Sequence, residues 1–341
     1  MKRASKKSLL STLLLFGCLF ILSVFSGFAQ GSFALVIHGG AGNIDKASLS
    51  EQEQEAYLVK LAEALKIGEE ILKDGGSSLD AVESVVRILE DSPLFNAGKG
   101  AVFTIDGKNE LDASIMCGNT LNAGAVAGIT NMKNPISVAR KVMENSPHVF
   151  LTGKGAETFG YEQGLELVDP GYFFDQRRWE QYRQHIRDNV DRNRSSIDTN
   201  IKMGTVGAVA LDMQGDIAAA TSTGGMVGKR YGRIGDSPLI GAGNYANNES
   251  CGVSATGHGE YFIRNMVAHD ISARVLYKGQ SLQGAAREVI MEKLKEQGAN
   301  GGIIAIDKEG NVVMEFNTTA MFRGFIDVEG EKKVMIFEDQ Y

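Results

Sequence analysis

Hydrophobic residues recur along this chain with two different spacings, which predict where strands and helices form. A continuous apolar run, typical of a buried strand, covers residues 34–37. Apolar residues at intervals of three and four predict helices over residues 53–73 and 77–92. The second helix begins at Ser77, the first residue of a capping box, and Pro93 ends it.

More strands are expected before residue 160. Runs rich in small and β-branched residues place them at residues 101–105, 110–116, 123–129 and 149–151. Pro135 opens a predicted helix that continues to Glu144. From residue 176 to residue 200 the pattern is charged and weakly periodic, which predicts a helix fading into a linker.

Short strands dominate the chain after residue 205. They are predicted at residues 206–211, 217–222, 251–254, 303–306 and 312–316. Two long amphipathic helices are predicted between them, over residues 260–277 and 282–297. Because strands come in runs and helices in pairs, we expect sheets covered by helix layers rather than alternating βαβ units.

An abrupt boundary separates the two halves of the chain. Residues 189–203 are polar and basic without a strand pattern, and a buried strand starts at Thr205 directly after Gly204. This boundary suggests a cut site, after which Thr205 would begin a new chain. A terminal threonine carries its own general base, the α-amine, beside its hydroxyl. The simpler interpretation is a strand that begins with threonine, a common β residue.

The N-terminus has the pattern of a secretory signal peptide. A basic start is followed by an uncharged apolar run over residues 9–25, and Gly27 and Ala29 supply the small residues that a signal peptidase reads. We expect removal of residues 1–29 and a periplasmic or secreted protein. The alternatives are an uncleaved membrane anchor, for which the run is short, and a lipoprotein site at Cys18.

Charge and cysteine content narrow the possible partners. The full chain has a formal net charge of −7. Residues 1–29 carry four positive and no negative charges, so their removal leaves a net charge of −7 − 4 = −11. An acidic protein of this kind has no electrostatic basis for binding nucleic acid or an anionic membrane surface. Only Cys117 and Cys251 remain, which predicts two buried free thiols, with a single disulfide as the alternative.

Motifs of several hydrolase and nucleotide-binding classes are missing from the chain. The sequence has no G-x-S-x-G elbow, no G-x-G-x-x-G after a strand and no C-x-x-C, and its five histidines lack zinc-type spacing. Threonine therefore remains as the best candidate nucleophile.

Three polar segments downstream of Thr205 carry candidate chemistry. Residues 221–225 end a strand with three hydroxyls, which also commonly cap loops. Arg233 and Asp236 place a cation and an anion in a glycine-rich loop, where they would form either a clamp for a zwitterion or a surface ion pair. Thr256 and Gly257 precede a helix and would form either an oxyanion site or a plain helix cap.

Together these segments resemble the plant-type L-asparaginase and isoaspartyl dipeptidase family of N-terminal nucleophile hydrolases. The resemblance spans nearly the whole mature chain and rests on ordered blocks. They are HGGAG (38–42), LFNAGKGAVFT (94–104), ELDAS (110–114), GNT (118–120), GAVAG (124–128), GTVGAVALD (204–212), ATSTGG (220–225), GRIGDSPLIGAG (232–243), ATGHGE (255–260) and GGIIAID (301–307).

The resemblance implies the fold, the processing and the assembly. The fold would be α+β, a four-layer αββα sandwich. The precursor would cleave itself between Gly204 and Thr205 into an α subunit (30–204, with a mobile linker from about residue 177) and a β subunit (205–341). Pairs of αβ units commonly dimerise in this family, so an (αβ)2 dimer is implied.

The resemblance also assigns roles to individual residues. Thr205 would be the nucleophile, its freed α-amine the general base, and Thr223 its hydrogen-bonding support. Arg233 would bind the α-carboxylate of the substrate and Asp236 its α-amine. Four more residues complete the implied site: the oxyanion pair Thr256 and Gly257, Gly259 in the pocket wall, and Asn96 facing the active site.

No cofactor is implied for catalysis, but a structural sodium ion is. Backbone carbonyls of one loop would bind it, those of Leu89, Glu90, Ser92, Phe95, Ala97 and Lys99. Lys99 stands where relatives often carry an apolar residue, although ligation by carbonyls does not depend on that side chain.

The implied reaction is hydrolysis of the side-chain amide of L-asparagine, of β-aspartyl (isoaspartyl) dipeptides, or of both, with release of L-aspartate. One alternative is a glycosylasparaginase, whose members usually have Asp before the nucleophile and Asn within T-S-T-N-G. Gly204 and Gly224 occupy those places here. The other alternative is an exported amino-acid-binding protein without catalysis.

Overall fold

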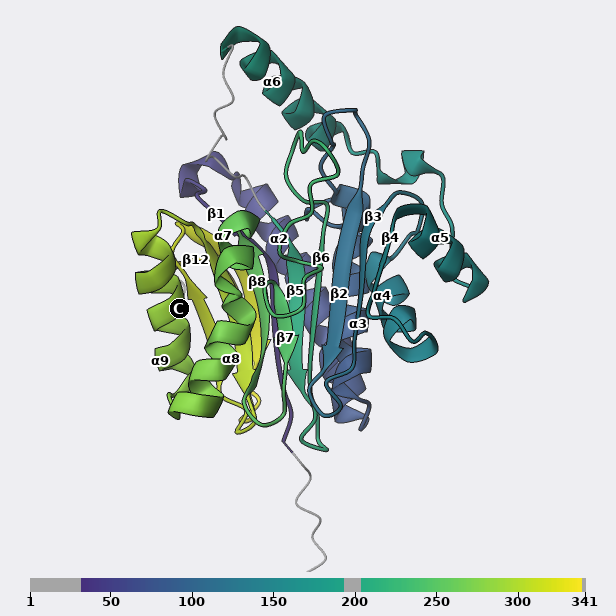
Figure 1. The fold of residues 1–341 in the computed structure, drawn as a ribbon. Helices are drawn as coiled ribbons and strands as arrows, with labels where there is room; N and C mark the ends of the chain where they lie inside the picture. The colour runs from purple at the N-terminus through teal and green to yellow at the C-terminus, as the bar shows by residue number, and fades with distance from the viewer. Residues whose placement is uncertain (1–31, 193–203, 339–341) are drawn as a thin grey trace, which may run out of the picture. The chain divides into compact units, whose positions relative to one another are not determined.

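Two sheets packed face to face form the centre of the molecule, in a computed structural model that describes residues 32–192 and 204–338 (Figure 1). The predicted signal peptide (1–29) and most of the segment before Gly204 lie outside the described residues. Helices cover the outer face of each sheet. The result is the four-layer αββα sandwich, which confirms the predicted α+β fold class.

The larger sheet has eight strands. Their order is β12 (Lys332–Phe337), β11 (Ala320–Ile326), β1 (Ala34–Gly42), β5 (Val206–Leu211), β6 (Ile217–Thr223), β2 (Leu111–Cys117), β3 (Ala123–Ile129) and β4 (Phe150–Thr152). Neighbouring strands run antiparallel except β3 and β4, which are parallel. Strands from both sides of the Gly204–Thr205 boundary therefore interleave in one sheet.

The smaller sheet has four antiparallel strands. Their order is β10 (Val312–Phe316), β9 (Gly301–Asp307), β8 (Cys251–Gly257) and β7 (Asn244–Ala246). The predicted hairpin of β9 and β10 is confirmed. Small residues let the sheets approach closely. At Gly207 of β5, a Cβ atom would overlap the Ser254 hydroxyl of β8.

The outer layers consist of helices from separate parts of the chain. The large sheet is covered by α2 (Glu51–Lys73), α3 (Ser78–Glu90) and α4 (Pro135–Asn145), and α5 (Gly153–Glu162) packs on β3. The small sheet is covered by α8 (Val267–Lys278), α9 (Leu282–Arg287) and the π-helix η4 (Glu288–Leu294), after α7 (Gly259–Asn265). The remaining helices are α6 (Gln176–Arg192) and the short 3-10 turns η1 (Lys46–Ser48), η2 (Gly98–Gly100) and η3 (Pro170–Phe173).

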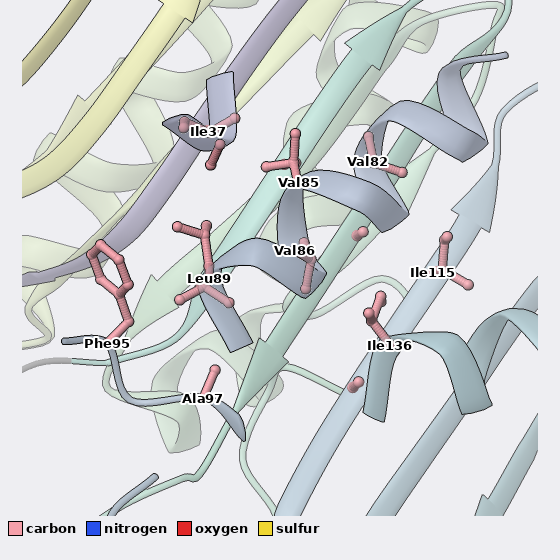
Figure 2. Close-up of a cluster of buried hydrophobic side chains, with 14 of the residues drawn as sticks. Ile37, Val82, Val85, Val86, Leu89, Phe95, Ala97, Ile115 and Ile136 are labelled. Atoms are coloured by element: carbon pink, nitrogen blue, oxygen red, sulfur yellow. The ribbon is translucent and has the colours of Figure 1, made fainter. Parts of the chain in front are cut away.

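The main core lies between α3 and the large sheet (Figure 2). Val82, Val85, Val86 and Leu89 are fully buried, and their spacing places them on one face of the helix. The Ser77 hydroxyl accepts a hydrogen bond from the Asp80 N–H at 3.1 Å, so the predicted start of this helix is confirmed.

Three local expectations are wrong. Residues 101–105 form a loop instead of a strand, because the N–H groups of Val102 and Ile105 bond to Asn96 Oδ1 and to the Lys229 carbonyl. The helix expected over residues 260–277 is broken at Met266, which adopts a left-handed conformation with φ of 46°. Cys117 is half-buried, while Cys251 is buried, and both are free thiols.

The described helices, those of residues 32–192 and 204–338, include none that is both long and apolar enough to cross a membrane.

The helical part of the predicted segment from residue 176 is confirmed by α6. Its Trp179 and Tyr182 rings pack against Phe103, which fixes α6 to the loop over residues 101–105.

Candidate active site

Thr205 lies at the start of β5, in the middle of the large sheet. Its side chain is 6% exposed, and its hydroxyl donates to Thr223 Oγ1 at 3.2 Å. The register of β5 and β6 pairs Val206 with Ser222, which brings the next residue of each strand end together. The predicted partnership of Thr205 and Thr223 thus follows from antiparallel pairing.

Ser237 also contacts the Thr205 hydroxyl, with 3.2 Å between the two Oγ atoms. Sequence reasoning did not select this residue. Its backbone carbonyl accepts a bond of 2.6 Å from the Ser114 hydroxyl of β2, which fixes the loop beside Thr205. In the sequence, only its position next to Asp236 could have indicated a role in the site. That its hydroxyl reaches Thr205 is seen only in the folded chain.

Thr256 approaches the same point from the small sheet. It is fully buried at the end of β8, and its hydroxyl oxygen accepts from the Ala41 N–H at 3.4 Å. A Cβ atom at Gly204 would lie 2.6 Å from Thr256 Oγ1, so the two residues are in direct contact. Gly40, with φ of 110°, packs against the Gly204 backbone from the other side. Side chains at Gly40 and Gly204 would disrupt this approach.

Gly257 follows Thr256 and has φ of 154°, a conformation that other residues rarely adopt. Its Cβ position is 2.6 Å from the Asn300 carbonyl. Of the predicted oxyanion pair, Thr256 therefore contacts Gly204 directly, and Gly257 is the next residue of the same strand.

Arg233 and Asp236 lie side by side over Gly259. A Cβ atom at Gly259 would be 2.8 Å from Arg233 Nη2 and 2.9 Å from Asp236 Oδ1, so glycine keeps this space open. Arg233 also pairs with Glu260, through bonds of 2.9 Å from Nε and 3.0 Å from Nη2. The two residues predicted as a clamp therefore lie together, and Glu260, an acid that sequence reasoning had not selected, pairs with Arg233.

Asp236 is nearly completely buried. Its Oδ2 atom accepts no hydrogen bond from the residues that the structure describes. Burial raises the pKa of Asp236 to about 7, although the nearby Arg233 acts in the opposite direction. A buried acceptor without a partner is costly, and an ammonium group would satisfy it.

Asn96 supports the site from behind Thr223. Its amide donates to the Gly225 carbonyl at 2.7 Å, and its Oδ1 accepts from the Val102 N–H at 3.0 Å. The two ends of the side chain therefore join the turn at Gly225 to the loop over residues 101–105. The structure brings Asn96 into the site mainly through that turn.

The loop after α3 presents the carbonyls expected to bind sodium. Side chains at Gly98 and Gly100 would overlap the carbonyl oxygens of Glu90 and Phe95, so glycine is required for this tight turn. Of the six expected carbonyls, those of Glu90, Ser92, Phe95 and Lys99 accept no hydrogen bond from the described residues. The other two do: Leu89 accepts from the Ser92 N–H at 3.3 Å, and Ala97 from the Gly100 N–H at 3.1 Å. Among the residues that the structure describes, no cluster of three or more His, Cys, Asp or Glu side chains could hold a metal ion. Oxygen donors of this kind fit a hard cation such as sodium.

Comparisons with known proteins agree with this geometry. A family model described as asparaginase matches residues 31–336. The isoaspartyl peptidase of Escherichia coli is 52% identical over 87% of this chain and 93% of its own. A probable isoaspartyl peptidase/L-asparaginase of Arabidopsis thaliana is 43% identical over 91% and 100%. A plant-type L-asparaginase of Pyrococcus abyssi is 44% identical over 86% and 96%.

These matches cover almost every described residue, and the αββα sandwich agrees with them. The family expected from the ordered sequence blocks is confirmed. The chain belongs to the asparaginase family that includes plant-type L-asparaginases and isoaspartyl peptidases, and it is a hydrolase of the N-terminal nucleophile type.

Proposed function

We propose that the protein is an exported, self-cleaving threonine amidohydrolase that releases L-aspartate from β-aspartyl dipeptides and from L-asparagine. The main support is the convergence of hydroxyls on Thr205, from Thr223 and Ser237 on one side and from Thr256 beside Gly204 on the other. The names of the relatives support a β-aspartyl substrate over the glycosyl-asparagine alternative.

Self-cleavage is the first proposed step. While the Thr205 nitrogen is part of a peptide bond, its hydroxyl attacks the Gly204 carbonyl carbon. The nitrogen leaves and takes the hydroxyl proton, so that an ester replaces the peptide bond. This shift frees the α-amine. Water then hydrolyses the ester, which gives the Gly204 carboxylate, restores the Thr205 hydroxyl and separates residues 30–204 from residues 205–341. Glycine suits this position because it tolerates strained backbone.

The mature reaction uses the same hydroxyl. The Thr205 α-amine takes the proton as Oγ1 attacks the side-chain carbonyl of the substrate. The Thr256 hydroxyl and the Gly257 N–H stabilise the oxyanion, and the amine product leaves with the proton. Water then attacks the aspartyl ester, which releases aspartate and restores the hydroxyl.

Charge complementarity selects the aspartyl part of the substrate. The Asp236 carboxylate accepts from the substrate ammonium, and the Arg233 guanidinium binds the α-carboxylate. Glu260 holds Nε and Nη2 of Arg233, which leaves Nη1 for the substrate. Gly259 provides the space between the two charged groups.

The assembly is also part of the proposal. Residues 1–29 are removed on export, and two αβ units form a dimer. The carbonyls of Leu89, Glu90, Ser92, Phe95, Ala97 and Lys99 would hold a sodium ion, which would stabilise the loop before Asn96 and take no part in the reaction.

Two measurements on purified protein test the proposal. Intact mass should show two chains, the second beginning at Thr205. Steady-state kinetics should show turnover of a β-aspartyl dipeptide and of L-asparagine, and little turnover of a glycosyl-asparagine. Efficient turnover of the glycosyl-asparagine alone would contradict the proposed substrate, and one persistent uncleaved chain would contradict self-processing.

A further inference from the structure

A buried ion pair lies beside the active site, next to Thr223. The Lys229 side chain is 1% exposed, and its Nζ donates to the Glu110 carbonyl at 3.0 Å. Nζ also lies 3.9 Å from Asp112 Oδ2, whose side chain is likewise 1% exposed. Glu110 Oε2 is equally 3.9 Å from Nζ, but the Glu110 side chain is 29% exposed, so Asp112 is the buried partner. Neither residue has a part in the reaction as described so far.

Burying two charges is costly unless they are paired and hydrogen-bonded. Asp112 Oδ1 accepts from the Gly128 N–H at 2.8 Å, but Oδ2 accepts no hydrogen bond from the described residues and faces the ammonium. Burial raises the pKa of Asp112, and Lys229 acts in the opposite direction. A pair with an incomplete hydrogen-bond set is a poor device for stability alone.

The position of the pair points to the nucleophile. Asp112 of β2 stands directly opposite Thr223 of β6 in the sheet register. Lys229 contacts the turn that follows Thr223, since a Cβ atom at Gly225 would lie 3.1 Å from Nζ. The Gly225 N–H donates to Thr223 Oγ1 at 3.0 Å, and Thr223 Oγ1 also accepts from Thr205.

We propose that the Lys229–Asp112 pair is a positioning device for the Thr205 nucleophile. The ammonium supports the turn at Gly225, whose N–H orients the Thr223 oxygen, and this oxygen in turn orients the Thr205 hydroxyl. The inference rests on the proposed function, because it assigns the pair to the rate of the Thr205 reaction and not to substrate binding.

The first experiment separates positioning from stability. Lys229→Met removes the ammonium but keeps the length of the side chain. Lys229→Met/Asp112→Asn also removes the buried carboxylate charge that the first change leaves unpaired, while Glu110 stays in contact with water. Measured per cleaved chain on a β-aspartyl dipeptide, kcat should fall about tenfold or more in both variants, with KM changed less than about twofold. The thermal midpoint should drop in the single variant and recover in the double variant. If kcat recovers together with the midpoint, the pair is only structural.

The second experiment tests the path through Thr223. In a Thr223→Val background, Lys229→Met should change kcat less than about twofold, because the hydroxyl through which it acts is gone. A full, additive loss in that background would overturn the inference. Lys133→Met, which removes an ammonium paired with Glu166 on the surface, is the control and should leave kcat unchanged.

The self-cleavage rate of freshly made precursor provides a second measure of the same hydroxyl. It should slow in Lys229→Met and in the double variant. An inactive but self-cleaving wild-type protein would contradict the proposed substrate, whereas a wild-type kcat and cleavage rate in Lys229→Met would contradict the positioning inference alone. If the single variant does not fold, the double variant supplies both rates.

Discussion

The proposed nucleophile, Thr205, lies among hydroxyl groups from three separate parts of the chain. Thr223, Ser237 and Thr256 lie in β6, in the following loop and in β8, and the fold brings all three to the Gly204–Thr205 bond. A hydroxyl is a weak nucleophile, so its orientation toward the carbonyl carbon and toward its base determines the rate. Ser237, which sequence reasoning missed, is the sharpest test of this arrangement.

Ser237→Ala should lower kcat about tenfold and leave KM nearly unchanged, because it removes one hydrogen bond of ordinary strength to the nucleophile and none to the substrate clamp. Steady-state kinetics on a β-aspartyl dipeptide would measure both constants. Ser250→Ala is a suitable control, since that hydroxyl bonds to Ser272 far along the chain from Thr205. A change in KM without a change in kcat would place Ser237 in substrate binding instead.

The clamp makes a prediction about pH. Burial raises the pKa of Asp236 from 3.8 to about 7, so its carboxylate is protonated below that value in the free enzyme. A neutral Asp236 binds an ammonium poorly, and kcat/KM should therefore fall as the pH drops through about 7. The pH profile of kcat/KM measures this limb directly. A flat profile between pH 6 and pH 8 would contradict a buried, titrating Asp236.

Asp236→Asn should show the linked effect on stability. A folded-state pKa above the unfolded one means that the carboxyl favours folding at low pH and that this contribution is lost as the pH rises through about 7. The variant should therefore melt about 5 °C higher than the wild type at pH 8 and at a similar temperature at pH 4. Activity should be lost, which is the expected trade between a buried functional charge and stability.

At the scale of single elements, periodic hydrophobic patterns predicted the helices and strands whose apolar side chains pack in the core. Helix α3 was predicted from apolar residues at intervals of three and four, and that spacing matches its buried face because one side of the helix lies against the sheet. Strand β11 was missed because Arg323 and Gly324 interrupt its apolar run. Arg323 is buried there because its guanidinium donates to the carbonyls of Met321 and Ile336, a compensation that exists only in the folded chain.

The same limit explains the wrong expectation for residues 101–105. Their extended pattern resembles a strand, yet their partners are Asn96 and Lys229 from other loops. Individual site residues were predicted because ordered blocks of sequence carry them. Ser237, Glu260 and Lys229 gained their contacts from tertiary structure, for which no local pattern exists.

The core under α3 predicts the cost of a cavity. Val85 is fully buried and lies against Gly68 of α2, where a Cβ atom would be 2.8 Å from a Val85 methyl. Val85→Ala should lower the free energy of unfolding by about 2 kcal/mol. Val59→Ala, at a position of α2 that is 53% exposed, should change it by less than about 0.5 kcal/mol. Urea unfolding in a Thr205→Ala background would keep the chain in one piece for both measurements.

At the scale of the whole molecule, the proposed cut at Gly204–Thr205 would not divide the structure into two bodies. In the large sheet, β1 of the N-terminal half lies between β11 and β5 of the C-terminal half, and β6 of the C-terminal half pairs with β2 of the other. The proposed cleavage would therefore break one peptide bond and leave the strand pairs on both sides of it in place. This topology would let a nucleophile be created within an already folded sheet.

The interleaved sheet predicts how the cleaved protein behaves. Residues 30–204 and residues 205–341 should elute together in gel filtration under native conditions, and should separate only in a denaturant strong enough to unfold the sheet. The physical reason is that dissociation would expose the fully buried β1, β5 and β6 and break their backbone hydrogen bonds. Intact mass of each fraction identifies the chains, and the uncleaved Thr205→Ala protein is the size control. Separate native elution of the two chains would show that the pairing of β1 with β5 does not survive the cut. The proposed active site needs the contact between Ala41 of one chain and Thr256 of the other, so this result would contradict it.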